Sequence, residues 1–175
     1  MHQNNFTEIT TERLVLRKLK ETDWEMISYL RSDKEVNKFV KRPNAPSKEK
    51  ALEFISKTNN AIDNNSILYW VITEKGKNEM IGSICLWNFS EDKKKAEVGY
   101  DLSPEFQRKG IMDESLKNIL KFGFNTLLLD AIVAYTQYNN ESSVKLLKRN
   151  NFKLVEDLKD EENEYNRIFE IKKEA

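Results

Sequence analysis

The chain has 175 residues, of which 39% are hydrophobic and 33% charged, a composition typical of one folded domain rather than a disordered or fibrous protein. Its 29 Lys and Arg residues balance 29 Asp and Glu residues, and this zero net charge disfavours a nucleic-acid-binding protein that relies on a basic excess. One cysteine, Cys85, and one histidine, His2 near the N-terminus, exclude a serine–histidine–aspartate triad, an intramolecular disulfide and a zinc site built from several Cys or His ligands.

Membrane and export signals are missing from the sequence. The first 13 residues are polar and lack the apolar centre of a signal peptide, and no apolar run approaches the roughly 20 residues of a membrane span. We therefore expect a soluble, cytoplasmic protein with no membrane or nucleic-acid partner and no metal, folded as a single domain over residues 1–175. Its chemistry must then use carboxylates, hydroxyls, amines and backbone groups.

The first part of the chain predicts one strand followed by two helices. Residues 13–19 alternate apolar and basic side chains, which is the pattern of a half-buried strand. Thr22 and Glu25 have the spacing of a capping box, so we expect a helix to begin there. A proline-containing break at residues 42–46 follows, and Ser47 is placed to cap the second helix.

The middle of the chain predicts three strands and a helix. Residues 67–73 and 80–89 are rich in β-branched and aromatic side chains and flank a short charged turn, which indicates an antiparallel hairpin. A third strand covers residues 95–102 and ends before Pro104, since proline cannot continue a paired strand. From Ile111 onward apolar residues recur at helical spacing, which predicts an amphipathic helix.

The last part of the chain predicts one more strand, one more helix and two closing strands. The strand covers residues 131–136, the helix residues 142–149, and the closing strands residues 152–158 and 165–171 around an acidic turn. This order of elements predicts an α/β domain with a mixed, mostly antiparallel sheet of about seven strands flanked by helices.

The segment at residues 107–112 lies between a strand end and a helix start, where the unpaired amides and the dipole of a helix favour an anion. Gly110 lacks the Cβ that would hold a phosphate away from the backbone, and Arg108 and Lys109 add two positive charges. A phosphate site and an ordinary turn before a helix both fit these residues.

Three further segments give the loop a context. Residues 107–112 resemble the acetyl-CoA pyrophosphate loop of the GNAT superfamily of N-acetyltransferases. Residues 11–17, residues 96–102 (Ala-Glu-Val-Gly-Tyr-Asp-Leu) and residues 140–147 (Asn-Glu-Ser-Ser-Val-Lys-Leu-Leu) are similar to motifs of its ribosomal-protein (RimJ/RimL-type) branch. The resemblance covers nearly the whole chain and implies a GNAT-like α/β domain.

The sequence departs from the family pattern at three places. Met112 stands where the general motif has Gly or Ala, so its side chain must point away from the phosphates. Asn151 replaces the usual Gly after the last helix, and Asn tolerates the left-handed conformation best among the other residues. Leu147 occupies the position of a Tyr that protonates the coenzyme A thiolate in many relatives, so that role does not carry over.

The resemblance implies acetyl-CoA as the co-substrate and places its contacts. The backbone amides of residues 108–112 would hold the pyrophosphate, while the main chain at Leu102 and Ser103 would pair with pantetheine as an added strand. Asn140 and Ser143 would lie against the pantetheine arm. Gln107 would lie beside the loop, and Arg149 would approach the adenosine end. The implied contacts are therefore Leu102, Ser103, Gln107, Arg108, Lys109, Gly110, Ile111, Met112, Asn140, Ser143 and Arg149.

Two carboxylates are candidates for the catalytic base that accepts the proton of the amine. Glu97 and Asp101 share one face of their strand because side chains alternate. The resemblance includes Glu97, which is therefore the first choice. The alternative is that Glu97 serves a structural ion pair with a basic residue such as Arg17 or Lys95.

Other groups near this strand have narrower roles. The backbone amide near Val98 or Gly99 is the expected donor to the thioester carbonyl. Cys85 is expected to be a small buried strand residue rather than a nucleophile, because no base is available to activate it. Trp70 and Trp87 lie on the central hairpin, as core residues or as walls of the acceptor pocket.

The leading functional hypothesis is an acetyl-CoA-dependent N-acetyltransferase that acts on a primary amine, such as the N-terminal α-amine of a ribosomal or other protein. One alternative is an acetyltransferase for a small amine, such as a polyamine, amino acid or antibiotic. Another is a non-catalytic coenzyme A-binding sensor or interaction protein. In the family the acceptor is bound by the first helices and the late loops, here residues 33–46 and 157–167. The resemblance also leaves a homodimer open.

Overall fold

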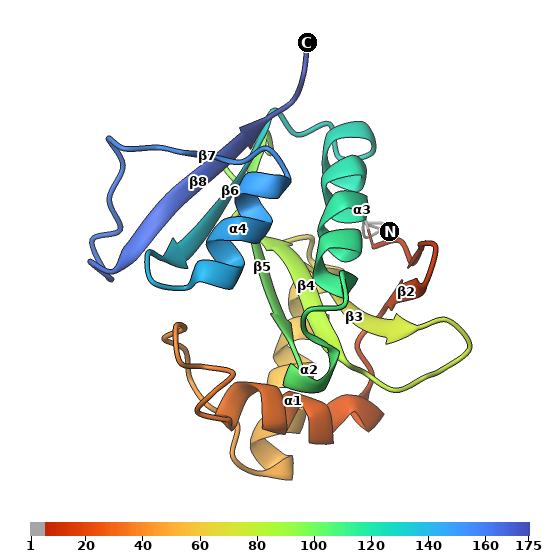
Figure 1. The fold of residues 1–175 in the computed structure, drawn as a ribbon. Helices are drawn as coiled ribbons and strands as arrows, with labels where there is room; N and C mark the ends of the chain where they lie inside the picture. The colour runs from red at the N-terminus through yellow and green to blue at the C-terminus, as the bar shows by residue number, and fades with distance from the viewer. Residues whose placement is uncertain (1–5) are drawn as a thin grey trace.

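The computed structural model describes residues 6–175, so His2 lies outside the described residues. Eight strands and four α-helices follow one another along the chain (Figure 1). Their bounds are β1 (Ile9–Thr10), β2 (Leu14–Arg17), α1 (Trp24–Ser32), α2 (Lys48–Asp63), β3 (Leu68–Glu74), β4 (Gly82–Trp87), β5 (Lys95–Leu102), α3 (Ile111–Asn125), β6 (Ala131–Gln137), α4 (Glu141–Arg149), β7 (Lys153–Leu154) and β8 (Asn166–Lys172).

All eight strands belong to one sheet in the order β1-β2-β3-β4-β5-β6-β8-β7. Neighbouring strands run antiparallel except β5 and β6, which run parallel. The predicted α/β class and mostly antiparallel sheet are confirmed. The sheet has eight strands rather than about seven, because the two residues of β1 pair with β2 at the edge.

The predicted capping box at the start of the first helix is wrong. A short 3-10 turn, η1 (Glu21–Asp23), precedes α1, and no side chain caps the helix start. The Asp23 carboxylate instead accepts hydrogen bonds from the Lys20 amide at 2.8 Å and from the Arg17 guanidinium at 2.7 and 2.9 Å. The Ser47 cap is confirmed, since its Oγ accepts the Lys50 amide at 3.2 Å.

The strand expected over residues 152–158 is reduced to β7, because only Lys153 and Leu154 pair with β8. Asn151 precedes it with φ of 66°, so asparagine does adopt the left-handed conformation after α4. A second 3-10 turn, η2 (Pro104–Phe106), follows β5 and ends it where Pro104 was expected to.

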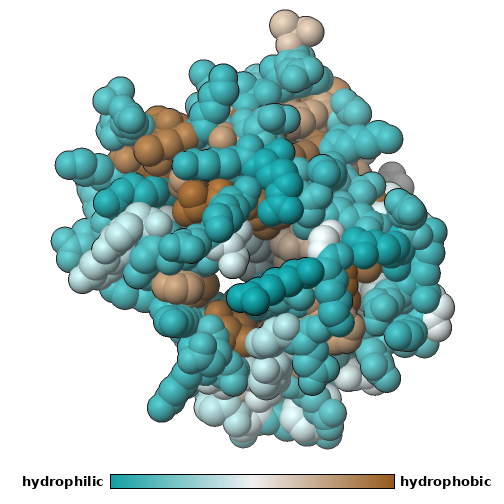
Figure 2. Space-filling model, viewed as in Figure 1, coloured by the Kyte–Doolittle hydropathy of each residue, from teal (hydrophilic) through white to brown (hydrophobic). Residues whose placement is uncertain are grey.

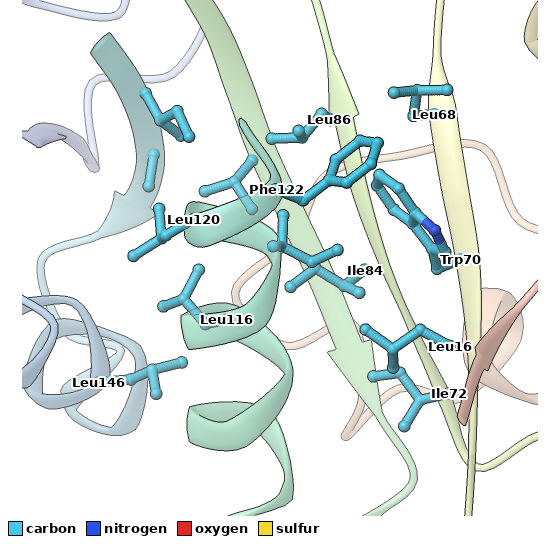
Figure 3. Close-up of a cluster of buried hydrophobic side chains, with 14 of the residues drawn as sticks. Leu16, Leu68, Trp70, Ile72, Ile84, Leu86, Leu116, Leu120, Phe122 and Leu146 are labelled. Atoms are coloured by element: carbon cyan, nitrogen blue, oxygen red, sulfur yellow. The ribbon is translucent and has the colours of Figure 1, made fainter. Parts of the chain in front are cut away.

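The two faces of the sheet bury separate cores because strand side chains alternate. On one face α3 packs over β3 and β4, and the rings of Trp70 and Phe122 meet edge to face at 5.5 Å (Figure 3). On the other face α1 and α2 cover Tyr69 and Val71. Trp70 is therefore a core residue.

The sheet opens between its two parallel strands. β5 pairs with β6 only from Lys95 to Glu97, so residues 98–102 have no partner strand on that side. Figure 1 shows β5 and β6 diverging below this point, and Figure 2 shows the surface hollowed in the middle of the molecule. Within the described part of the chain, no helix is long and apolar enough to cross a membrane.

Candidate active site

The unpaired edge of β5 exposes backbone groups to the opening. The Ser103 amide donates to the Ile81 carbonyl at 2.9 Å, so the odd-numbered residues of β5 direct their amides toward β4. The amides of Val98 and Tyr100 then point to the side of β6. Of the two donors that the sequence singled out, Val98 rather than Gly99 is therefore directed toward this side.

The loop after β5 presents a row of amides. Arg108 and Gly110 both have positive φ, at 62° and 75°, and Gly110 is the N-cap of α3. Within the described residues, the amides of residues 108–112 donate no hydrogen bond. Such a run of free amides at a helix N-terminus binds anions. The side chains of Arg108 and Lys109 are exposed beside it.

Arg13, which lies between β1 and β2, holds the shape of this loop. Its Nη1 donates to the Lys109 carbonyl at 2.9 Å, and its Nε pairs with the Glu114 carboxylate at 2.7 Å. A Cβ on Gly110 would lie 3.3 Å from Arg13 Nη2. Met112 packs against the main core, as the departure from the motif required. The loop therefore fits a diphosphate group.

The remaining residues implied for acetyl-CoA lie at both ends of α4 and beside β5. Asn140 Oδ1 accepts the Ser143 amide at 3.3 Å, and Ser143 Oγ lies 2.6 Å from the Tyr100 hydroxyl. Gln107 Nε2 donates to the Leu102 carbonyl at 3.0 Å. Arg149 Nε lies 3.9 Å from Asp113 in the first turn of α3, which places it near the loop. The Ser103 amide, by contrast, already donates to the carbonyl of Ile81, which directly precedes β4, so this amide is not free to bind pantetheine.

The carboxylate of Glu97 is buried where β5 and β6 part, and it has no ion-pair partner among the described residues. It is 9% exposed and accepts a hydrogen bond from Asn88 Nδ2 at 3.3 Å. Burial raises the pKa of Glu97 to about 7, and the nearby negative charge of Asp160 acts in the same direction.

The alternative structural role of Glu97 is not formed among the described residues. Arg17 pairs with Asp23 at 2.7 Å, and Lys95 lies 3.9 Å from Glu170. The carboxylate of Glu97 is therefore available to exchange a proton near neutral pH.

Asp101 lies on the same face as Glu97 but is fully engaged. Its Oδ2 pairs with Arg42 Nη1 at 3.0 Å, and its Oδ1 accepts the Ser83 hydroxyl at 2.5 Å. The ion pair joins the segment between α1 and α2 to the sheet. Glu97 is therefore the better placed of the two candidate bases.

We expect Asp101→Asn to lower the melting temperature by about 5–10 °C while leaving the pH dependence of activity unchanged. Removal of the carboxylate leaves the half-buried Arg42 without its charge partner, which costs about 2–3 kcal/mol. Thermal unfolding followed by circular dichroism measures the effect. An unchanged melting temperature together with an altered pH profile would instead make Asp101 the base.

Two residues at the opening were missed by the sequence analysis. Asn88 acts on Glu97 from a turn, and Tyr100 lies within the matched strand motif but has no assigned role there. Asp160, which also acts on Glu97, belongs to the late loop that was expected near the acceptor. Trp87 is 43% exposed and lies opposite Glu97 on β4, which makes it a wall residue rather than core. The pKa of Cys85 is raised to about 12 by burial, so this thiol is not an activated nucleophile.

Among residues 6–175, no group of three or more His, Cys, Asp or Glu side chains is placed to hold a metal ion. The geometry described above consists of a row of amides, one carboxylate with a raised pKa and a hydroxyl pair around one opening.

A family model and a curated relative match most of this chain. A family model described as acetyltransferase (GNAT) domain matches residues 13–153. The uncharacterized N-acetyltransferase YoaA of Bacillus subtilis (strain 168) is 30% identical over 147 residues, which cover 84% of this chain and 83% of YoaA.

Two solved structures share the fold at lower sequence identity. RimL, a ribosomal-protein α-N-acetyltransferase in complex with coenzyme A, superposes with a TM-score of 0.80 at 19% identity and covers 95% of this chain and 98% of its own. The self-immunity acetyltransferase MccE, in complex with acetyl-CoA and AMP, has a TM-score of 0.77 at 20% identity and covers 92% of this chain and 93% of its own.

Proposed function

We propose that this chain, which belongs to the acetyltransferase (GNAT) domain family, is an N-acetyltransferase that moves the acetyl group of acetyl-CoA directly onto a primary α-amine. The observation that carries the proposal is the carboxylate of Glu97. It is buried, lacks an ion-pair partner among the described residues, and has a pKa raised to about 7. A base whose pKa lies near the working pH is the most effective kind.

The strength of this base indicates which amine it serves. An α-amine with a pKa of about 8 lies one unit from pH 7, so its deprotonation costs about 1.4 kcal/mol. A lysine side chain at about 10.4 lies more than three units away and costs roughly 4.6 kcal/mol. Proton transfer to a carboxylate whose pKa is about 7 is nearly balanced for the first amine and strongly uphill for the second. This difference favours an α-amine.

Acetyl-CoA supplies a reactive thioester, so the chain needs to provide only binding, orientation and proton transfer. We assign the loop amides to its pyrophosphate and the amides of Val98 and Tyr100 to the unpaired edge that receives the pantetheine and acetyl portion. The Tyr100–Ser143 hydroxyl pair lies on the opposite face of β5 from Glu97. Burial raises the pKa of Tyr100 to about 12, so its hydroxyl stays protonated. Leu147, which stands where many relatives have the tyrosine that protonates the thiolate, is apolar and buried in the core. We therefore assign the Tyr100–Ser143 pair to the sulfur that departs.

The source of the α-amine is proposed from the relatives. RimL is named as a ribosomal-protein α-N-acetyltransferase, and its fold matches this chain over nearly the whole length. A protein N-terminus is therefore our first candidate acceptor. MccE, which shares the fold and was determined with AMP, supports a small-molecule amine as the second.

The test is release of coenzyme A thiol in the presence of a panel of amines. The panel contains short peptides with free N-termini, the same peptides blocked at the N-terminus but carrying lysine, and polyamines. We expect rapid release with free N-termini and slow release with lysine-only peptides. Release with no amine of the panel, despite tight binding of acetyl-CoA, would support a coenzyme A-binding sensor instead.

A further inference from the structure

Two arginines lie near Asp101 on the side of the sheet that α1 and α2 cover. Arg31 is in the last turn of α1, and Arg42 is in the segment that joins α1 to α2. Both guanidinium groups are half-buried rather than extended into solvent. The ion pair of Arg42 with Asp101 fixes this segment against β5.

Arg42 is engaged within the protein through all three of its guanidinium nitrogens. Its Nη1 pairs with Asp101 at 3.0 Å, its Nη2 donates to the Leu30 carbonyl at 2.7 Å, and its Nε donates to Asn37 Oδ1 at 2.7 Å. One carboxylate thus compensates Arg42 and leaves nothing for the second arginine.

Arg31 is held in place without a charge partner. Its guanidinium stacks over the Phe54 ring at 4.1 Å from the centroid, and its Nη2 donates to the Pro43 carbonyl at 3.2 Å. No carboxylate of the described residues lies within ion-pair distance of it, so most of its donors remain available. A guanidinium that is half-buried, oriented and uncompensated is the arrangement that binds an anion.

Arg31 lies on the same side of the sheet as the proposed base, because the Phe54 ring on which it stacks packs against Tyr69. Burial and the charge of Arg42 lower the pKa of Arg31, while Tyr69, Asp101 and Cys85 act in the opposite direction. Tyr69 and Cys85 are paired across β3 and β4, and Cys85 is opposite Gly99 on β5. The cleft therefore has a negative end at Glu97 and Asp160 and a positive end at Arg31.

The distance between the two ends can be estimated from the spacing of residues along β5. Gly99 is two residues and Asp101 four residues from Glu97 along β5. At about 3.4 Å per residue these two positions lie roughly 7–14 Å from the base along the strand, and the positive end lies beside them.

We infer that Arg31 is a specificity-determining residue that binds a carboxylate or phosphate of the acceptor, roughly 7–14 Å from the amine that is acetylated. The inference rests on the proposed function, since it takes Glu97 as the position of the amine. The α-carboxylate of a free amino acid is too close to its own amine to reach both ends. An acidic side chain at the second to fourth position of an extended peptide, or a small amine with a distal anionic group, has the required span.

The first test compares matched acceptors with the wild-type enzyme. One pair of peptides differs only by Glu or Gln at the third position, and a second pair is an aminoalkyl phosphate and the corresponding neutral amino alcohol. We expect kcat/KM to be at least about tenfold higher for the anionic member, the effect of one charged hydrogen bond. Preference within the peptide pair indicates a protein acceptor, and preference within the small-molecule pair indicates a metabolite.

The second test uses Arg31→Met, with Lys57→Met as a control that removes one positive charge from the exposed side of α2. Arg31→Met is expected to reduce the anionic-to-neutral ratio to about one without changing kcat/KM for the neutral acceptor, while Lys57→Met leaves the ratio unchanged. A purely structural role would lower activity toward both acceptors equally.

Each contradicting result identifies what failed. Equal rates with charged and neutral acceptors in the wild type, or a preference that survives Arg31→Met, would overturn the anion site and leave acetyl transfer intact. Failure to release coenzyme A with any amine would contradict the proposed function and this inference together.

Discussion

Glu97→Gln is expected to lower kcat by about 10²–10⁴-fold while the Kd of acetyl-CoA stays within about twofold of the wild-type value. Glutamine keeps the shape of the side chain and its acceptor oxygen for Asn88, but it cannot take a proton from the amine. The amides that we assign to the pyrophosphate lie in a different segment, the loop of residues 108–112. Thiol-release kinetics give kcat, and isothermal titration calorimetry gives the Kd.

Glu170→Gln is the matched control for this variant. Glu170 is a carboxylate of β8, two strands away from β5 in the sheet; it is paired with Val133 of β6 and lies 3.9 Å from Lys95. It has no role in the proposed reaction, so its replacement is expected to leave kcat unchanged. If both variants retain full activity, a group other than Glu97 removes the proton.

Glu97→Gln is expected to lower activity but to raise stability above neutral pH. The pKa of Glu97 rises from 4.5 to about 7 on folding, so the folded state favours the protonated form. The contribution of Glu97 to wild-type stability is then largest below about pH 4.5 and is lost as the pH rises through 7. Glu97→Gln escapes this loss, and above pH 7 it is expected to be more stable by on the order of 1 kcal/mol, after allowance for an open, water-filled cleft. Melting curves at pH 5 and pH 8 test this.

Gly110→Val is expected to weaken the binding of acetyl-CoA by about 100-fold. Gly110 has φ of 75°, which costs an ordinary residue about 1–2 kcal/mol, and a Cβ there would lie 3.3 Å from Arg13 Nη2. The loop must shift, and the loss of one amide–phosphate bond adds about 1.5–3 kcal/mol. Together these terms amount to about 2.5–5 kcal/mol, or at least about two orders of magnitude in Kd.

Gly76→Val separates the backbone effect from the binding effect. Gly76 lies in the turn between β3 and β4 with φ of 79°, and a Cβ there would meet no atom within 4 Å. The backbone penalty is thus similar, but the turn is distinct from the proposed site. We expect both valine variants to lose stability and only Gly110→Val to lose affinity. Equal affinities would remove the loop from the acetyl-CoA site.

Much of the fold follows from short-range patterns in the sequence. The alternation over residues 95–102 predicts the bounds of β5 as the structure has them, and the helical spacing after Ile111 predicts α3. The capping box at Thr22 fails because a competing interaction comes from outside the helix. The helical turn begins earlier, at Glu21, where the Asp23 carboxylate accepts the Lys20 amide and is also held by the guanidinium of Arg17.

The site is predicted less completely than the fold. Motif resemblance located the amide loop and Glu97, but the sequence left open whether Glu97 forms a structural ion pair. Its neighbours decide the matter: Arg17 and Lys95 are engaged elsewhere, and burial changes the acidity of the carboxyl group. The pairing of Arg42 with Asp101 joins residues far apart in sequence, so the positive end of the cleft was out of reach of sequence analysis.

The pH dependence of kcat/KM for wild-type enzyme and a free N-terminal peptide tests the central claim most directly. If the carboxylate of Glu97 accepts the amine proton, kcat/KM rises with pH and bends near pH 7, where the pKa of Glu97 lies, and this bend disappears in Glu97→Gln. A profile that shows the same bend in both proteins would contradict the account.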